Sequence, residues 1–268
     1  MTEQRITLKI ENNIAIVNLN RADKHNAIDM AMFHALDKVS KKLSKNKAIR
    51  AVFLSGNGED FCSGLDVKSV LKAKSNILQL LFKFIPGNSN LAQRVSTNWR
   101  KIPVPVVAII QGRCWGGGLQ IALGADFRIT TPDASLSIME AKWGLIPDMG
   151  ANLALRELVN IDIAKHLAMT GEIINAQQAL KYGLITQVSN DPYQAALRLI
   201  EPVIERSPDS VAAVKKLYNN NWHKKSWHML AKESLYQIKV ILGKNQQRAV
   251  KKQLSPEHAK DFDNRQNW

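Results

Sequence analysis

Two glycine-rich segments have residue types and spacing that could support chemistry. The first, residues 61–66, reads FCSGLD, and the second, residues 112–120, reads GRCWGGGLQ. Three consecutive glycines at the start of an apolar helical stretch leave the N–H groups of the first turn uncovered and allow close approach by a ligand. A helix N-terminus also carries partial positive charge. The second segment could therefore hold a phosphate or stabilise an oxyanion that forms during a reaction.

The spacing around these glycines does not match the common phosphate-binding loops. No Gly-Lys-Ser/Thr follows them, and the G-x-G-x-x-G spacing of dinucleotide-binding turns is absent from the segment. A glycine run can also serve the close packing of a helix on a strand, which needs no ligand. The glycines alone leave packing and oxyanion binding open.

The elements that must position these turns alternate between strands and helices. Residues 6–11 and 14–19 are β-prone and flank Asn12-Asn13, which predicts a hairpin. Compact apolar runs predict buried strands over residues 51–54, 103–110 and 125–130. Apolar residues at helical spacing predict helices over residues 29–43 and 67–81. Short strands alternating with helices favour an α/β fold with buried parallel pairings.

The strand signal fades from about residue 175 onward. Residues 192–206 and 210–240 have amphipathic helical patterns, and residues 244–268 are polar and end in Trp268, which we expect to be exposed. No low-complexity linker separates this part from the rest. We predict a core over residues 1–200 and a helical C-terminal region over residues 201–268 that packs on the core or on a neighbouring subunit.

The composition is that of an ordinary globular protein with a strong basic surplus. Of 268 residues, 45% are hydrophobic and 22% are charged, which excludes disordered and fibrous classes. The chain has 37 basic and 23 acidic residues, so its formal net charge is 37 − 23 = +14. Such a surplus favours a polyanionic partner, whether nucleic acid, an acidic membrane or a phosphorylated small molecule.

Cysteine usage and hydropathy indicate the class of compartment. Cys62 and Cys114 are the only cysteines, so there is no disulfide framework and no metal-ligand spacing, and both are most simply small core residues. The N-terminus lacks an apolar signal core, and no apolar run approaches the roughly 18 residues of a membrane span. These features predict a soluble, cytoplasmic protein without a bound metal.

The order of motifs along the chain resembles the crotonase superfamily, the enoyl-CoA hydratases and isomerases, over roughly residues 5–265. Each motif alone is weak, but together they follow one another in the family's order. They are RADKHNA (21–27), FCSGLD (61–66), IPVPVVAIIQG (102–112), WGGGLQIALGADFRI (115–129), Glu140 with WGLIPDMG (143–150), and MTGEIINAQQALKYGLITQV (169–188).

The resemblance implies a fold and a ligand. Family members form a spiral of ββα units with a C-terminal helical region that helps to make trimers, often paired into hexamers. They bind a coenzyme A thioester, which is the substrate rather than a separate cofactor, and stabilise its enolate with two backbone N–H groups. On the matching positions these oxyanion-hole donors are the N–H groups of Leu65 and Gly117.

The resemblance also places residues along the substrate. Lys24 matches a family position near the CoA phosphates, and residues 65–68 match the segment that borders the adenine and pantetheine. Trp115 and Trp143 flank the predicted site, where lining of the acyl pocket and burial in the core both explain an indole. The residues predicted to bind substrate are Lys24, Ala27, Ser63, Gly64, Asp66, Val67, Lys68, Trp115, Gly116 and Trp143.

The acidic residues decide which reaction the resemblance implies. Family hydratases use two glutamates, but the first position holds Gln120, whose amide cannot act as an acid or base and could only orient a water. The second position holds Glu140, and Asp148 stands at the offset where dienoyl-CoA isomerases carry an aspartate. We predict double-bond isomerisation with Glu140 as principal base and Asp148 as partner acid. A solvated carboxylate at Glu140 and a turn or cap role for Asp148 are the structural alternatives, and Asp126 is expected to be structural.

Other functions remain open on the sequence. Hydration would need the missing glutamate to be compensated, with Asp148 as the candidate. RNA binding is suggested by the charge and by a family branch, but the lysine pairs lack interleaved aromatic residues, which disfavours nucleic acid. A catalytically quiet CoA-binding subunit is the third alternative. The lysine pairs are Lys41-Lys42, Lys215-Lys216, Lys224-Lys225 and Lys251-Lys252.

Overall fold

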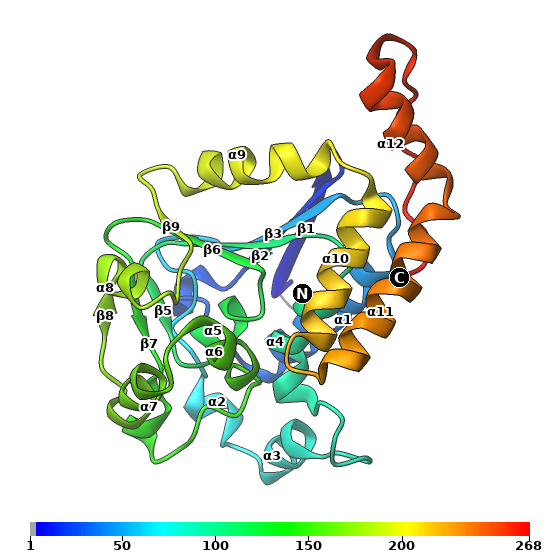
Figure 1. The fold of residues 1–268 in the computed structure, drawn as a ribbon. Helices are drawn as coiled ribbons and strands as arrows, with labels where there is room; N and C mark the ends of the chain where they lie inside the picture. Colours follow the sequence, from blue (N-terminus) through cyan, green and yellow to red (C-terminus); the bar gives the residue numbers. More distant parts are fainter. Residues whose placement is uncertain (1–3) are drawn as a thin grey trace.

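The structure is a computed structural model that describes residues 4–268, and it begins with a β-hairpin (Figure 1). Strands β1 (Ile6–Glu11) and β2 (Ile14–Leu19) pair antiparallel. Asn12 and Asn13 between them have φ values of 48° and 63°. Asparagine tolerates this left-handed conformation, and two such residues make the turn that matches the twist of a hairpin. The predicted hairpin is confirmed.

A mostly parallel sheet forms the centre of the molecule, with strand order β1-β2-β3-β4-β6-β9. From β2 onward the neighbours run parallel. Strand β4 is buried along its whole length, as expected for a strand covered on both faces. The strands that follow the hairpin are β3 (Ala51–Gly56), β4 (Val106–Ile110), β6 (Phe127–Thr130) and β9 (Gln187–Val188).

A second, smaller sheet runs beside the first, with order β5-β7-β8. The chain leaves β4 for β5 and returns to β6, then leaves again for β7, so that successive units add one strand to each sheet. This repeated strand–strand–helix unit confirms the predicted α/β spiral. The small-sheet strands are β5 (Arg113–Trp115), β7 (Ser135–Ser137) and β8 (Ile174–Asn175).

Helices cover both faces of the large sheet. Alternate residues such as Phe53 and Val107 pack beneath α9 (Pro192–Ile204), whereas Leu54 and Ala108 face the main core between the two sheets. Trp99 is among the largest side chains buried in that core. The helices around the core are α1 (Met30–Lys45), α4 (Leu91–Lys101), α5 (Gly117–Ala122), α6 (Asn152–Leu158), α7 (Ile161–Thr170) and α8 (Ala176–Lys181). Short 3-10 helices lie in the connections: η1 (Ala22–Lys24), η2 (Met139–Trp143) and η3 (Pro256–His258).

The helix predicted over residues 67–81 is wrong, because the structure divides it into α2 (Val67–Val70) and α3 (Lys74–Leu81). In a continuous helix the Val70 carbonyl would accept from the backbone N–H of Lys74. Here the side-chain amide of Asn76 donates to that carbonyl at 3.1 Å, and Ala73 is extended. The side chain thus replaces the helical hydrogen bond and reorients the chain before α3.

The C-terminal region is helical, as predicted. Residues 210–240 form two helices that pack together, α10 (Pro208–Asn221) and α11 (Ser226–Ile241). After them, α12 (Lys244–Leu254) projects from the body (Figure 1). Helix α9 spans the boundary predicted at residue 200 and packs on β3, β4 and β6. Within residues 4–268, no helix combines the length and apolar character needed to cross a bilayer.

Trp268 is half-buried and held in place, so the expectation of an exposed terminus is wrong. Its indole N–H donates to Asp209 Oδ1 at 3.0 Å, and its ring lies edge-on to Tyr236 with centroids 5.8 Å apart. The Lys239 ammonium lies 4.2 Å from the centre of the same ring. The polar tail therefore packs back along the C-terminal helices.

Candidate active site

The site lies where strand-like segments of the smaller sheet end side by side. Cys62 forms a parallel bridge with Cys114 of β5, through hydrogen bonds from Cys62 N–H to the Arg113 carbonyl (2.9 Å) and from Trp115 N–H to the Cys62 carbonyl (3.0 Å). On the other side of β5, Trp115 pairs in parallel with Ser137 of β7. Parallel segments end at the same edge of a sheet, which is where ligands usually bind in such folds.

This register brings the predicted oxyanion-hole donors and the predicted base to one edge. Leu65 follows Cys62 by three residues, and Gly117 follows Cys114 by three. Glu140 follows the last residue of β7 by three. Each of these three residues follows a paired strand position by three residues. This common spacing brings residues that are far apart in the sequence to one cavity.

The turns at this edge require glycine. Gly64 has φ +100°, and Gly116 has φ 49° with ψ −122°, conformations that side chains rarely adopt. A Cβ atom on Gly64 would lie 2.9 Å from the Trp115 carbonyl oxygen and 3.7 Å from the Gly117 nitrogen. The first turn is therefore packed directly against the start of α5, and no side chain separates the two.

The two predicted donors are available to a ligand. Among residues 4–268, neither the Leu65 N–H nor the Gly117 N–H donates to a protein acceptor. Both residues line a cavity of about 130 Å³, whose wall is mostly apolar and contains two carboxyl groups. The cavity is lined by Ser63, Gly64, Leu65, Val67, Gly116, Gly117, Met139, Glu140, Trp143, Leu145, Asp148 and Met149.

Glu140 is buried in the wall of this cavity, in η2. Its Oε1 accepts a hydrogen bond from Gln120 Nε2 at 2.6 Å, whereas its buried Oε2 has no partner among the described residues. Burial raises the pKa of Glu140 above its ordinary value, the hydrogen bonds from Gln120 and from its own backbone N–H oppose this, and the charge of Asp148 adds to the rise. A carboxylate with one oxygen held and the other unpartnered is suited to accept a substrate proton.

Gln120 holds Glu140 in place. The side chain is fully buried, and its Oε1 accepts from the Met149 backbone N–H at 2.9 Å. Because a backbone N–H can only donate, this contact fixes the orientation of the amide and turns its NH₂ group toward Glu140. The amide thus connects protein groups on both sides, with Oε1 bonded to the Met149 N–H and Nε2 bonded to Glu140.

Asp148 lies at the mouth of the cavity, with much of its surface open to solvent. Burial of part of the carboxyl still raises its pKa, opposed by a hydrogen bond from its own backbone N–H. Helix α6 begins with Ala151 as its N-cap, so Asp148 does not cap it. The two acids affect each other electrostatically, since the charge of Asp148 raises the pKa of Glu140.

An arginine that the sequence analysis did not single out joins the two segments predicted to border CoA. Arg21 donates to the Ala27 carbonyl at 3.0 Å and to the Asp66 carboxylate at 2.8 Å. Asp66 also caps α2 by accepting from the Ser69 N–H at 3.1 Å. Burial raises the pKa of Asp66, but the hydrogen bonds from Arg21 and Ser69 outweigh it and hold the pKa below its ordinary value. The only sequence signal was the position of Arg21 at the start of the RADKHNA motif.

The remaining predicted contacts divide into those near the cavity and those away from it. Lys24 and Lys68 are exposed on the two segments that Arg21 joins, outside the cavity wall. Trp143 lines the cavity and is 61% exposed. The structure does not bring Trp115 into the cavity: its indole N–H donates to Ser135 Oγ at 3.1 Å.

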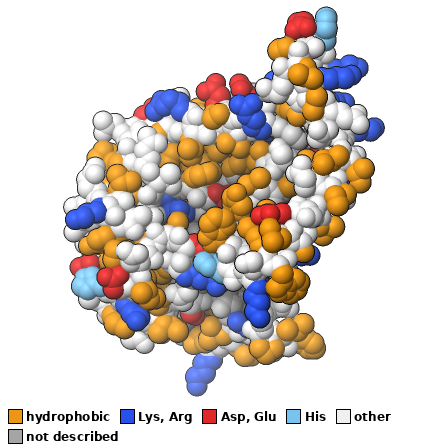
Figure 2. Space-filling model, in the orientation of Figure 1, with side chains coloured by type: hydrophobic (Ala, Val, Ile, Leu, Met, Phe, Trp, Pro, Cys, Tyr) orange, Lys and Arg blue, Asp and Glu red, His pale blue; other side chains and the backbone are white. Residues whose placement is uncertain are grey.

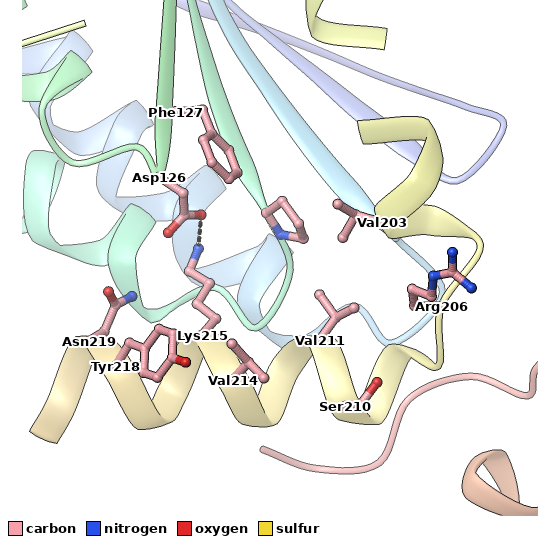
Figure 3. A pocket seen from close by; sticks show the side chains of 11 residues that line it. Asp126, Phe127, Val203, Arg206, Ser210, Val211, Val214, Lys215, Tyr218 and Asn219 are labelled. Carbon is pink, nitrogen blue, oxygen red and sulfur yellow. Dashed lines mark hydrogen bonds and ion pairs between the residues drawn. The ribbon is translucent and has the colours of Figure 1, made fainter. Parts of the chain in front are cut away.

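The cysteines and Asp126 have structural roles, as predicted. Cys62 and Cys114 are fully buried, and burial raises the pKa of the Cys62 thiol to about 12. Asp126 accepts from the Val106 N–H at 2.8 Å and pairs with Lys215 at 2.6 Å, at the base of a separate hollow of about 360 Å³ beside α10 (Figure 3). Lys215 is therefore paired and unavailable to a nucleic acid. Within the described part of the chain, no three His, Cys, Asp or Glu side chains gather as metal ligands.

The chain matches a known protein family over most of its length. A family model described as enoyl-CoA hydratase/isomerase matches residues 9–257. A carnitinyl-CoA dehydratase from Proteus mirabilis is 30% identical over 218 residues, which cover 80% of each chain. An (E)-benzylidenesuccinyl-CoA hydratase from Thauera aromatica is 29% identical over 214 residues, covering 79% of this chain and 80% of its own.

The fold has close counterparts among solved structures. The crystal structure of an enoyl-CoA hydratase from Bacillus anthracis matches with a TM-score of 0.86 at 25% identity, covering 96% of this chain and 98% of its own. An enoyl-CoA hydratase structure from Mycobacterium smegmatis has the same TM-score at 21% identity, covering 96% of this chain and 99% of its own. These likenesses confirm the predicted crotonase-like fold.

Proposed function

The chain belongs to the enoyl-CoA hydratase/isomerase family, and on that premise we propose that it moves the double bond of an enoyl-CoA thioester. The observation that carries the proposal is the pairing of one buried carboxylate, Glu140, with a neutral amide at Gln120. An amide cannot deliver or accept the proton that a second glutamate would handle in hydration. Isomerisation needs no acid or base at position 120: it needs a base at one carbon and a proton donor at another, and Asp148 lines the same cavity as Glu140.

We propose the N–H groups of Leu65 and Gly117 as the oxyanion hole. Their free donors face a largely apolar cavity, where hydrogen bonds to a developing negative charge are stronger than in water. The thioester oxygen becomes negative when the neighbouring carbon loses its proton. Donors that are already in place stabilise this enolate without reorganising.

Proton movement then falls to the two carboxyl groups. In the proposed reaction the carboxylate of Glu140 accepts a proton from C2 of a 3-enoyl thioester, and the electron pair shifts through the dienolate to C4. Asp148, whose pKa is raised by burial of part of its carboxyl, acts in its protonated form as the proton donor at C4 and can exchange protons with solvent at the cavity mouth. The product is the 2-enoyl thioester, and the proton on Glu140 passes through solvent at the cavity mouth to Asp148, so that both carboxyl groups return to their starting forms. No proton is gained or lost in the net reaction.

Binding of the CoA portion is assigned to the segments that Arg21 joins. Lys24 and Lys68 are exposed there and offer positive charge to the phosphates, while Asp66 is occupied by Arg21 and by the cap of α2. We therefore propose that Asp66 contributes through the shape of its turn rather than through direct contact. CoA enters the reaction as part of the substrate, and no separate cofactor is needed.

The test is to incubate the purified protein separately with a 3-enoyl-CoA and with crotonyl-CoA, and to identify products by mass and chromatography. We expect conversion of the 3-enoyl-CoA, a loss of about 10²- to 10⁴-fold for Glu140→Gln, and a smaller loss for Asp148→Asn. Hydration of crotonyl-CoA that survives Glu140→Gln but is lost with Asp148→Asn would overturn the assignment of the base. CoA binding without turnover of either substrate would favour a non-catalytic role.

Hydration is the second candidate, and one observation favours it. Asp148 and Glu140 line the same cavity, so Asp148 could supply the carboxyl that Gln120 lacks. Relatives at 29–30% identity are a dehydratase and a hydratase. Net addition of water to crotonyl-CoA that requires both acids would establish this alternative.

We also propose that the C-terminal region mediates a trimer, alone or paired into a hexamer. The support is the exposed apolar surface of α11 and the residue after it, where Trp227 is 68% exposed and Leu242 is 80% exposed. Sedimentation equilibrium measures the mass directly. We expect a species of three or six chains, and a monomer at micromolar concentration would contradict the proposal.

A further inference from the structure

A second exposed apolar surface lies on α2, α3 and the chain that follows them. Val70 and Leu80 are buried and attach this segment to the core, while the residues between and after them point outward. Phe84 is 93% exposed, and its neighbours are exposed by half or more in most cases. We call this surface the α2–α3 face, and its apolar members are Leu71, Ile77, Leu78, Leu81, Phe82, Phe84 and Ile85.

The charged residues of the segment that carries the α2–α3 face are all basic. No Asp or Glu occurs between residues 67 and 125, a span that contains eight Lys and Arg residues. Lys72 and Lys74 are exposed, Lys83 is half-buried, and none of the three forms an ion pair with another described residue. Figure 2 shows hydrophobic side chains gathered along the edge where α3 lies in Figure 1, with Lys or Arg beside them.

This combination restricts the partner. A second copy of the chain related by two-fold symmetry would bring the same lysines against one another, which is electrostatically unfavourable, and the subunit contacts proposed above use the separate apolar surface of α11 and Leu242. A nucleic acid would leave the aliphatic side chains without an apolar counterpart. An anionic lipid surface matches both features, because apolar side chains enter the boundary of the acyl region while lysines contact phosphate head groups.

We propose that the α2–α3 face docks on anionic lipid surfaces. Phe82, Phe84 and Ile85 form the apolar contact, and Lys72, Lys74 and Lys83 supply the charge. The docking segment begins at Val67, which lines the cavity of the candidate active site. Docking therefore holds the mouth of that cavity near the lipid. It also gives a role to part of the +14 net charge, because binding one CoA needs only a few of these cations.

The test is co-sedimentation of the full-length protein with vesicles of phosphatidylcholine, with and without phosphatidylserine, over a range of salt concentrations. We expect binding only to the vesicles that contain phosphatidylserine, and weaker binding as salt rises. Neutralising Lys72, Lys74 and Lys83 with glutamine should weaken binding about fivefold for each lysine. Phe84→Ser should weaken it at least as much as one lysine.

Matched controls lie on α12, away from this face. Leu254 is 78% exposed, and Lys251 and Lys252 are also exposed, so Leu254→Ser and a double lysine-to-glutamine variant change similar side chains elsewhere. These controls should bind vesicles like the wild type. The substituted residues of the α2–α3 face are surface groups, and turnover of a soluble short-chain enoyl-CoA in the absence of vesicles should be unchanged.

Two results would overturn the inference. One is the absence of binding to phosphatidylserine vesicles at low salt. The other is binding that the α12 controls reduce as much as the α2–α3 variants do. If Phe84→Ser instead lowers the oligomeric mass, and the wild type does not bind vesicles, the face is a subunit interface and the proposal is wrong. None of these readouts depends on the reaction that the cavity catalyses.

Discussion

Replacing Gln120 with methionine tests whether its amide controls the ionisation of Glu140. Methionine has a similar length and volume but cannot donate, so Gln120→Met removes the 2.6 Å hydrogen bond to Glu140 Oε1. That bond stabilises the ionised carboxylate and opposes the effect of burial on its pKa. Its loss should raise the pKa of Glu140 further. The acid limb of kcat/KM against pH should then move upward.

The size of the effect follows from the geometry. A hydrogen bond to a charged group contributes about 1.5–3 kcal/mol, which corresponds to a loss of about ten- to hundredfold in kcat/KM on the acid limb. On the alkaline plateau Glu140 is ionised in both proteins, so the loss there should be smaller. The Met149 N–H is also left without an acceptor, which should lower the free energy of unfolding by about 1–3 kcal/mol. Denaturant unfolding checks that the variant is folded.

Asp148→Asn should shift the pKa of Glu140 in the opposite direction. The charge of Asp148 raises the pKa of Glu140, so removing it should lower that pKa and move the acid limb downward. The assay is kcat/KM for a 3-enoyl-CoA measured across the acid limb for the wild type and both variants. The assigned roles would be refuted if the acid limbs of Gln120→Met and Asp148→Asn moved in the same direction relative to the wild type. They would also be refuted if the acid limb of Gln120→Met did not move.

Further predictions concern stability and the turns of the site. Burial raises the pKa of Glu140 in the folded state. Between the ordinary pKa of 4.5 and this raised pKa, the folded chain therefore binds more protons than the unfolded chain. The free energy of unfolding falls as pH rises through that window. Glu140→Gln should therefore lose activity yet unfold at higher denaturant than the wild type at neutral pH. Gly64→Ala places a Cβ 2.9 Å from the Trp115 carbonyl oxygen in a residue with φ +100°. This variant should lower the free energy of unfolding by at least about 1 kcal/mol and lower kcat by about 10²-fold or more. An unchanged kcat would argue against the oxyanion hole. Lys215→Met leaves Asp126 unpaired and should lower the free energy of unfolding by about 3–5 kcal/mol, measured by denaturant titration, whereas an unaffected midpoint would contradict the buried ion pair.

The sequence predicted the strands and the large-scale order of the fold because its local signals agree with the final structure. The apolar run of β4 is buried on both faces, and the Asn12-Asn13 turn has the conformation that its residues favour. Local signals failed where a side chain from further along the chain intervenes. The amide of Asn76 takes the Val70 carbonyl and ends α2, which periodicity in residues 67–81 could not reveal.

Some features of the candidate site could be predicted from the sequence, and others could not. Motif order predicted that Leu65, Gly117 and Glu140 lie together, and all three line one cavity because the register of neighbouring strands brings them to the same edge. The bridge from Met149 through Gln120 to Glu140 could not be predicted, since it needs the orientation of a buried amide.

The C-terminal tail shows the limit of composition as evidence. Polar residues near the end of the chain suggested an exposed Trp268, yet buried Asp209 accepts hydrogen bonds from Trp268, from Asn245 and from the backbone of Gln266. A carboxylate in α10 thus orders a segment that looks solvated from its composition alone.

The most direct test of the central claim is to follow a 3-enoyl-CoA in water enriched in oxygen-18, with the wild type and with Glu140→Gln. If Glu140 moves a proton beneath the two backbone donors, the first product is a 2-enoyl-CoA of unchanged oxygen mass, and Glu140→Gln forms it at least about 100-fold more slowly. A first product that is a 3-hydroxyacyl-CoA carrying oxygen-18, formed equally fast by Glu140→Gln, would contradict the account.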